Sequence, residues 1–177
     1  HTEYSLLDGS NKIKEYVKRV KELGMNSAAI TDHGNMYGVV EFYKTAKAND
    51  INPVIGCEVY VAPNSRFDRE TSHGDDRYYH LILLAENNTG YANLMKIVSI
   101  GFTEGYYYRP RVDFETLERY HEGLICLSAC LAGEIPRYIV RGFYDEAKEI
   151  ARKYQEKKKK DNFFLELQDH GIDDQKL

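Results

Sequence analysis

Short apolar stretches alternate with segments of helical periodicity along this chain. The apolar stretches have the length of strands and are bounded by turn-forming residues, as buried strands are. They span residues 27–31, 53–62, 78–85, 123–128 and 163–168. Strands that alternate with helices are typical of βα units around a largely parallel sheet, which forms a barrel or a doubly wound fold. The pattern therefore predicts an α/β domain.

The segments between these strands gather their apolar residues on one helical face, as amphipathic helices do. The faces consist of Ile13, Val17, Val20 and Leu23, closed by Gly24; of Val39, Phe42, Tyr43 and Ala46; and of Tyr91, Leu94, Met95 and Val98. Residues 64–77 are polar and predict a surface loop. The run from Lys157 to Lys160 indicates the solvated end of a further helix, where cations suit the helix dipole.

Composition narrows the class of protein. With 177 residues and 42% hydrophobic content, the chain can bury the core of one domain. The net charge of -4 argues against a broad basic face that would grip nucleic acid unaided. Cys57, Cys126 and Cys130 are odd in number and lack Cys-x-x-Cys spacing, so they indicate neither a disulfide framework nor a zinc ribbon. No apolar run approaches the ~20 residues of a membrane span, and we expect a cytoplasmic protein without a membrane partner.

Side chains that bind metals recur at the ends of the predicted strands. They are His1, Asp8, His33, Glu58, His80 and Cys130. Imidazoles, carboxylates and thiolates are the groups that hold borderline divalent metals. Because the ends of parallel strands converge on one rim, we expect these side chains to meet there.

Each of these residues also has a purely structural interpretation. Taken alone, Asp8 is a helix cap, Glu58 a salt-bridged carboxylate, His80 a satisfied core histidine and Cys130 a small buried hydrophobe. A parallel sheet has little reason, however, to place two histidines, a glutamate and a cysteine beside its buried strands. Taken together, the residues therefore predict a metal centre.

A loop rich in tyrosine and arginine is a second candidate site. Tyr106, Tyr107 and Tyr108 precede Arg109 and Arg111. Aromatic and arginine side chains together stack on and clamp single-stranded nucleic acid, so Arg109 and Arg111 are candidate nucleic-acid contacts. The simpler alternative is that the loop packs against a neighbouring domain, and the sequence leaves both interpretations open.

Several motifs carry a resemblance to a known family. They are HTEYSLLDG, AAITDHGNMYG, IGCEVYVA, YYHLILLA, YYRPRVD and LSACLAGEIP. Over almost the whole chain they resemble the PHP (polymerase and histidinol phosphatase) domain, and the last two resemble the branch found in the alpha subunit of bacterial replicative DNA polymerase III. The resemblance implies a distorted, TIM-barrel-like barrel of about seven βα units with a metal centre at the carboxyl ends of its strands.

The match to the family's motifs implies a role for each candidate ligand. His1 would be the second histidine of an opening His-x-His pair, and the further ligands would be Asp8, His33, Glu58, His80 and Cys130. Asp32 would not bind the metal itself; its carboxylate would orient a metal-bound histidine. The first histidine of the pair would lie upstream of residue 1 and a closing Asp-x-His beyond Leu177. We therefore expect residues 1–177 to be a partial PHP domain, an incomplete barrel of about five βα units.

The implied chemistry is hydrolysis of phosphate esters. Zinc or manganese ions, up to three in a complete domain, would polarise a phosphodiester and activate a metal-bound water held by the same residues. The implied parent is a DNA-directed DNA polymerase, with primer-template DNA and the other domains and subunits of the replicase as partners. Within it, the domain would be a 3'-5' exonuclease for proofreading or a structural platform. The alternative, a stand-alone PHP phosphatase for a small monoester such as histidinol phosphate, fits less well with the polymerase-like stretch 105–136.

Overall fold

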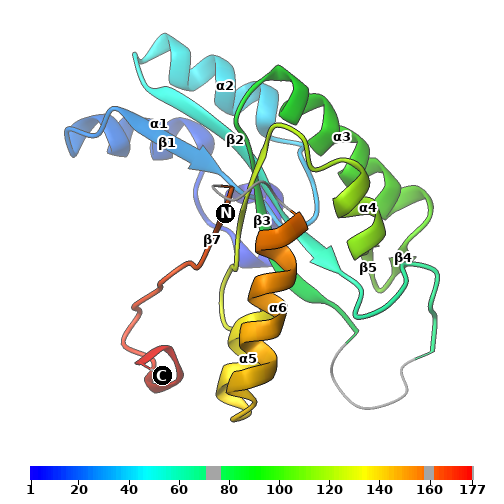
Figure 1. Cartoon of the computed structure of the whole chain (residues 1–177). Coiled ribbons are helices and arrows are strands. Elements are labelled where there is room, and N and C mark those ends of the chain that lie inside the picture. Colours follow the sequence, from blue (N-terminus) through cyan, green and yellow to red (C-terminus); the bar gives the residue numbers. More distant parts are fainter. Residues whose placement is uncertain (71–76, 158–161, 177) are drawn as a thin grey trace.

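The computed structural model describes residues 1–70, 77–157 and 162–176 as a mixed α/β fold. Figure 1 shows a twisted sheet that runs through the molecule with helices along its flanks. The helices are α1 (Ile13–Glu22), α2 (Val39–Ala48), α3 (Asn88–Thr103), α4 (Phe114–Arg119), α5 (Glu134–Val140) and α6 (Tyr144–Lys157), with the 3-10 helices η1 (Glu3–Asp8) and η2 (Asp173–Lys176). The α/β class predicted from the alternating pattern is confirmed.

The strands of the described residues form one sheet around the long strand β2. They are β1 (Ser27–Ile30), β2 (Asn52–Val61), β3 (Tyr79–Ala85), β4 (Tyr106–Tyr107), β5 (Arg109–Val112), β6 (Leu124–Leu127) and β7 (Phe163–Phe164). The order along the sheet is β4-β5-β2-β3-β6-β7. The first half of β2 pairs with β1, whereas its last residues, Tyr60 and Val61, pair with β5. The end of β2 is therefore flanked on both sides and lies inside the sheet.

The expectation of a largely parallel sheet is wrong. β1 and β5 run parallel to β2, but β3 runs antiparallel to both β2 and β6. Only parallel neighbours need a crossover connection, and the described residues between β2 and β3 contain no helix. The polar segment 64–77 is thus the connection of an antiparallel pair, although residues 71–76 lie outside the described part of the chain.

The predicted amphipathic helices are present as α1, α2 and α3, but their apolar faces are narrower than expected. Leu23, Tyr43 and Met95 are 53%, 49% and 42% exposed, so the expectation that they face the core is wrong. Leu23 follows the last residue of α1 and so leaves the helical face. The predicted helix before the lysine run is α6, which ends at Lys157, and the lysines that follow lie outside the described residues.

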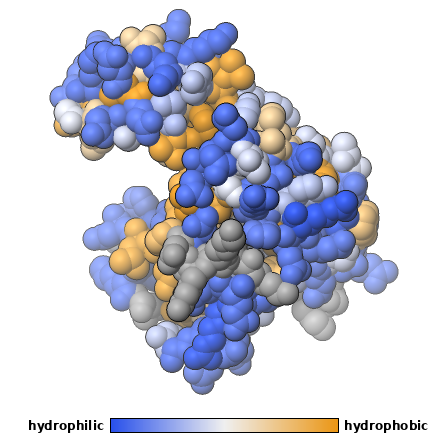
Figure 2. All heavy atoms as spheres, turned by 45° about the horizontal axis from the view of Figure 1, so that its top comes forward, coloured by the Kyte–Doolittle hydropathy of each residue, from blue (hydrophilic) through white to orange (hydrophobic). Residues whose placement is uncertain are grey.

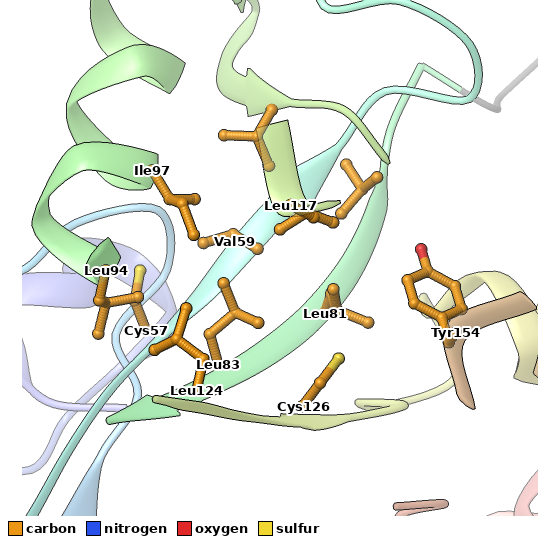
Figure 3. Close-up of a cluster of buried hydrophobic side chains, with 12 residues drawn as sticks. Cys57, Val59, Leu81, Leu83, Leu94, Ile97, Leu117, Leu124, Cys126 and Tyr154 are labelled. Carbon is orange, nitrogen blue, oxygen red and sulfur yellow. The ribbon is translucent and has the colours of Figure 1, made fainter. Parts of the chain in front are cut away.

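Two hydrophobic clusters fix the sheet. In the larger one, Leu94 and Ile97 of α3 pack with Leu83 of β3 and Leu117 of α4, as Figure 3 shows. Tyr154 of α6 completes this cluster from the other side. The smaller cluster joins α1 and α2 to β1. Because β2 and β3 are held between packed helices, the side chains at their adjoining ends have rigid supports.

The face of the molecule drawn in Figure 2 is mostly hydrophilic. Hydrophobic residues gather on this face at the narrow junction between the part at the top left of Figure 2 and the rest of the molecule. Among the described residues, no helix has the length and apolar character that a membrane span requires.

Candidate metal centre

Backbone pairing beyond β1 brings His33 next to Glu58. The two residues form an isolated parallel bridge, and the N–H of Gly34 donates to the carbonyl of Glu58 at 2.8 Å. Gly34 has a φ of 64°, and a Cβ atom there would lie 2.7 Å from the ring of Tyr60. Glycine therefore allows the chain to turn away directly after His33 without displacing Tyr60.

Asp32 ties the N-terminal segment to this strand end. Its buried carboxylate accepts hydrogen bonds from the N–H and hydroxyl of Thr2, at 2.5 and 2.7 Å, and from the hydroxyl of Ser5 at 2.7 Å. These contacts place His1 and Asp8 beside His33. We expected Asp32 to orient an imidazole directly, but within the described residues its carboxylate accepts from two hydroxyls and an amide instead. Asp32 positions the segment that carries two candidate ligands.

His80 and Cys130 reach the same point from the other side. His80 lies near the start of β3, directly opposite Tyr60 of β2, and its N–H donates to the carbonyl of Ala132 at 3.0 Å. Cys130 follows β6 through Ala129, whose φ of 63° is uncommon for a residue with a side chain. Uncommon backbone conformations of this kind cluster at functional sites, where they set the direction of a neighbouring side chain. Here the neighbour is Cys130.

The six predicted residues thus meet at one end of the sheet, and Glu58 lies between the others. Its Oε2 atom is 2.6 Å from Nδ1 of His33 and 3.4 Å from Nε2 of His1. Its Oε1 atom is 3.4 Å from Nδ1 of His80 and 3.9 Å from Sγ of Cys130. In each of these two groups all the donor atoms lie within 4.8 Å of one another. Asp8 extends the first group, with its Oδ2 atom 2.6 Å from Nε2 of His33.

The contacts around Glu58 shift the proton equilibria of the site. Burial alone would raise the pKa of the Glu58 carboxyl, but its contacts with His33 and His80 outweigh burial and lower that pKa to about 2. Burial alone would lower the pKa of His80, but its contacts with Cys130 and Glu58 raise it to about 9. The carboxylate is therefore ionised throughout the physiological range and attracts positive charge.

Two of the donor atoms fit a metal better than a hydrogen bond. Nδ1 of His33 and Oε2 of Glu58 are buried and have no hydrogen-bond partner within the described part of the chain, although they lie 2.6 Å apart. Their separation is that of an ion pair. Buried polar atoms without partners are costly, and a divalent cation held by both lone pairs would remove that cost. The set of imidazoles, carboxylates and a thiol suits a divalent metal ion.

Tyr60 supports the site, and it was not among the predicted residues. Its ring lies 6.2 Å from the ring of His33 and 5.3 Å from that of His80, between centroids. Burial raises the pKa of its hydroxyl to about 12, so the hydroxyl stays protonated. Alternation along a strand places Tyr60 on the same face as Glu58, two residues earlier, and this pattern could have identified it.

The two predicted nucleic-acid contacts have different surroundings. Arg109 is exposed, and its guanidinium lies 5.8 Å from the centre of the Tyr60 ring. Arg111 is only 3% exposed, and its guanidinium donates to the carbonyls of Gly105, Arg77 and Asp68 among others. A buried guanidinium committed to backbone carbonyls cannot reach a phosphate, so the structure contradicts the predicted role of Arg111.

Comparison with known proteins identifies the class. The model of the PHP domain family matches residues 1–170, and the chain belongs to that family. The resemblance seen in the sequence motifs is thereby confirmed.

Relatives specify the branch of the family. The chain is 52% identical over 176 residues to DNA polymerase III subunit alpha of Treponema pallidum and 48% identical over 177 residues to that of Borreliella burgdorferi. The matches cover 99% and 100% of this chain but only 15% of either relative, so the chain spans about a seventh of their length. An amidohydrolase structure from Chromobacterium violaceum overlaps 52% of this chain and 30% of its own, at 23% identity and a TM-score of 0.36.

Proposed function

We propose that this chain is the PHP domain of a DNA polymerase III alpha subunit and that its metal centre hydrolyses phosphodiester bonds. The observation that carries the proposal is the position of Glu58. One carboxylate oxygen faces His1 and His33, and the other faces His80 and Cys130. A carboxylate between two donor groups is suited to adjacent metal sites, which phosphoesterases use to clamp the attacking and leaving oxygens.

In this proposal each side of Glu58 has its own ligands. His1, Asp8 and His33 would hold zinc or manganese on one side, and His80 and Cys130 on the other. When bound, the divalent ions supply the Lewis-acid chemistry that phosphodiester hydrolysis needs. The protein's part is to orient these ligands, and it does so from strand ends fixed by the core and by Asp32.

The entrance to the site suits a phosphate-bearing substrate. A hollow of about 310 Å³ is lined by Asp8, His33, Tyr60 and Arg109. The Asp8 side chain is 80% exposed and reaches His33 from this open side. Arg109 places a permanent positive charge at the wall, where it would attract a phosphate.

The relatives' name extends the proposal to the parent protein. We assign residues 1–177 to part of the PHP domain of a DNA-directed DNA polymerase, with primer-template DNA and the other subunits of the replicase as partners. The domain would act as a 3'-5' exonuclease that removes misincorporated nucleotides. Its place would be the cytoplasm, where bacterial DNA is replicated.

The test is hydrolysis of a 3'-labelled oligonucleotide by the full-length protein, purified free of other nucleases and supplied with zinc or manganese. His80→Ala should lower the rate about 100-fold or more, because loss of a direct ligand should exceed the 10- to 100-fold effect of outer-shell changes. His121→Ala is the matched control, since His121 is only half-buried and lies on another loop, after α4. Hydrolysis by His80→Ala at the unmodified rate would contradict the proposal.

Two other results would redirect the assignment. Hydrolysis of histidinol phosphate but not of the oligonucleotide would favour the stand-alone phosphatase. Hydrolysis of neither, by a protein that still polymerises, would favour the structural platform.

A further inference from the structure

Exposed aromatic side chains line the hollow beside the candidate metal centre. Tyr37 precedes α2, Phe102 lies near the end of α3, and Tyr106 lies in β4. The ring centroids of Tyr37 and Phe102 are 6.3 Å apart, and those of Phe102 and Tyr106 are also 6.3 Å apart. These residues are 66%, 39% and 54% exposed, in chain order. Three elements of the chain thus contribute one continuous aromatic wall, here called the aromatic shelf.

The aromatic shelf and the metal donors open into the same space. Asp8, His33 and Arg109 line the hollow together with the shelf. The Arg109 guanidinium is 5.8 Å from the Tyr60 ring centre, and Tyr60 in turn lies against His33. A ligand in this hollow would therefore meet both flat apolar rings and cationic or metal-binding groups.

We propose that the aromatic shelf stacks on the terminal base of a single-stranded nucleic-acid end whose phosphate reaches the metal centre. This inference rests on the proposed phosphoesterase function and names the part of the substrate that the site recognises. Stacking on aromatic side chains accepts every base, because each base has a π-face. The shelf would therefore bind a frayed end regardless of sequence, which is the form in which a mispaired end is presented.

The size and chemistry of the hollow favour a nucleotide over a protein segment. An α-helix with its side chains is about 10–12 Å across, too wide for a hollow of about 310 Å³. A base joined to a phosphate combines a flat apolar face with negative charge, and the aromatic and cationic lining of the hollow complements both. An apolar peptide carries no negative charge to complement Arg109.

The experiment uses the full-length protein and a single-stranded oligonucleotide that ends in 2-aminopurine, whose fluorescence is quenched by stacking. Phe102→Leu and Tyr106→Leu keep apolar volume but remove the rings. Each should weaken binding about 5-fold or more and reduce the quenching, since base stacking contributes about 1–3 kcal/mol per ring. Phe143→Leu is the matched control, because Phe143 is also half exposed but lies between α5 and α6.

A second substrate separates this inference from the proposed function. An oligonucleotide whose terminal nucleotide lacks a base should be hydrolysed equally by the unmodified protein and by the shelf variants. If quenching depends on the shelf residues but no substrate is hydrolysed, the base-stacking proposal is supported and the proposed phosphoesterase function is contradicted. Quenching and affinity unchanged in both shelf variants would overturn the shelf, whatever the rate of hydrolysis.

Discussion

The imidazole rings of His1 and His33 stack with their centroids 3.9 Å apart and their planes 12° from parallel. Both rings also direct a nitrogen toward the same oxygen of Glu58. The two stacked imidazoles and this carboxylate oxygen therefore form one group of possible metal donors.

Replacing Glu58 by glutamine should therefore lower metal affinity about 100-fold or more. The amide has nearly the same shape, but it removes the negative charge that both donor groups share. Titration calorimetry with zinc and with manganese would measure the loss. Glu22→Gln, on the exposed surface of α1, is the control and should bind as the unmodified protein does. Equal affinities in the two variants would show that Glu58 is not a ligand.

The thiol of Cys130 should set the choice of metal. Thiolate ligands favour zinc over the harder manganese ion, so Cys130→Ser should lower zinc affinity about tenfold or more and manganese affinity less. Cobalt provides a direct readout, because a bound thiolate gives a charge-transfer band in the near ultraviolet that serine cannot give. Cys126→Ala should keep the band, since Cys126 is buried in the larger cluster. A band that survives Cys130→Ser would assign the thiolate to another residue.

Asp32→Asn should loosen the N-terminal segment. The asparagine amide presents one acceptor oxygen in place of the carboxylate that receives hydrogen bonds from Thr2 and Ser5. Hydrogen bonds to a charged group contribute about 1.5–3 kcal/mol, and unfolding by urea should show a loss of that order. Metal affinity should fall as well, about 10- to 100-fold, because His1 and Asp8 are no longer held in place.

The control for Asp32→Asn is Asp50→Asn, at an exposed position after α2. It should change neither stability nor metal binding. A variant at Asp32 that loses stability but binds zinc with full affinity would show that the segment is not needed to position the ligands.

The sequence predicts the central part of the fold because its strands are continuous apolar runs. The predicted strand at 78–85 is β3 at 79–85, and that at 53–62 is β2 at 52–61. β5 has no apolar run to predict it, since its sequence is RPRV. The apolar pattern of a strand does not tell its direction. The direction of β3 was indicated instead by the polar connection before it, which has no helical pattern and so suits an antiparallel pair.

The candidate ligands could be predicted for a related reason. Their chemical types are unusual next to buried strands, so each one stands out locally. The positions of Asp32 and Arg111 depend instead on partners far along the chain: Asp32 contacts residue 2, and Arg111 contacts residues 68 and 77. No local pattern distinguishes a buried charged residue with distant partners from one on the surface.

Asp113 should make stability sensitive to acid. Burial alone would raise the pKa of its carboxyl, but hydrogen bonds from Arg66 and Thr116 outweigh burial and lower it. A lowered folded pKa stabilises the fold above the unfolded value, about 3.9, and this contribution is lost as pH falls through the folded pKa. Urea unfolding at pH 2 to 6 should show a smaller pH dependence in Asp113→Asn. Asp145→Asn, at an exposed helix start, should leave the pH dependence unchanged.

Arg109 and Arg111 should separate nucleic-acid binding from stability, although they are two residues apart. Arg111→Met should lower the free energy of unfolding by about 3 kcal/mol, because the buried carbonyls of Gly105 and Asp68 lose a charged donor. Arg109→Met should leave stability within about 1 kcal/mol, since its guanidinium is exposed. For oligonucleotide binding the order reverses. Arg109→Met should reduce the slope of log binding constant against log salt concentration by about one, the value for one phosphate contact. Arg111→Met should leave this slope unchanged under conditions where the variant is folded.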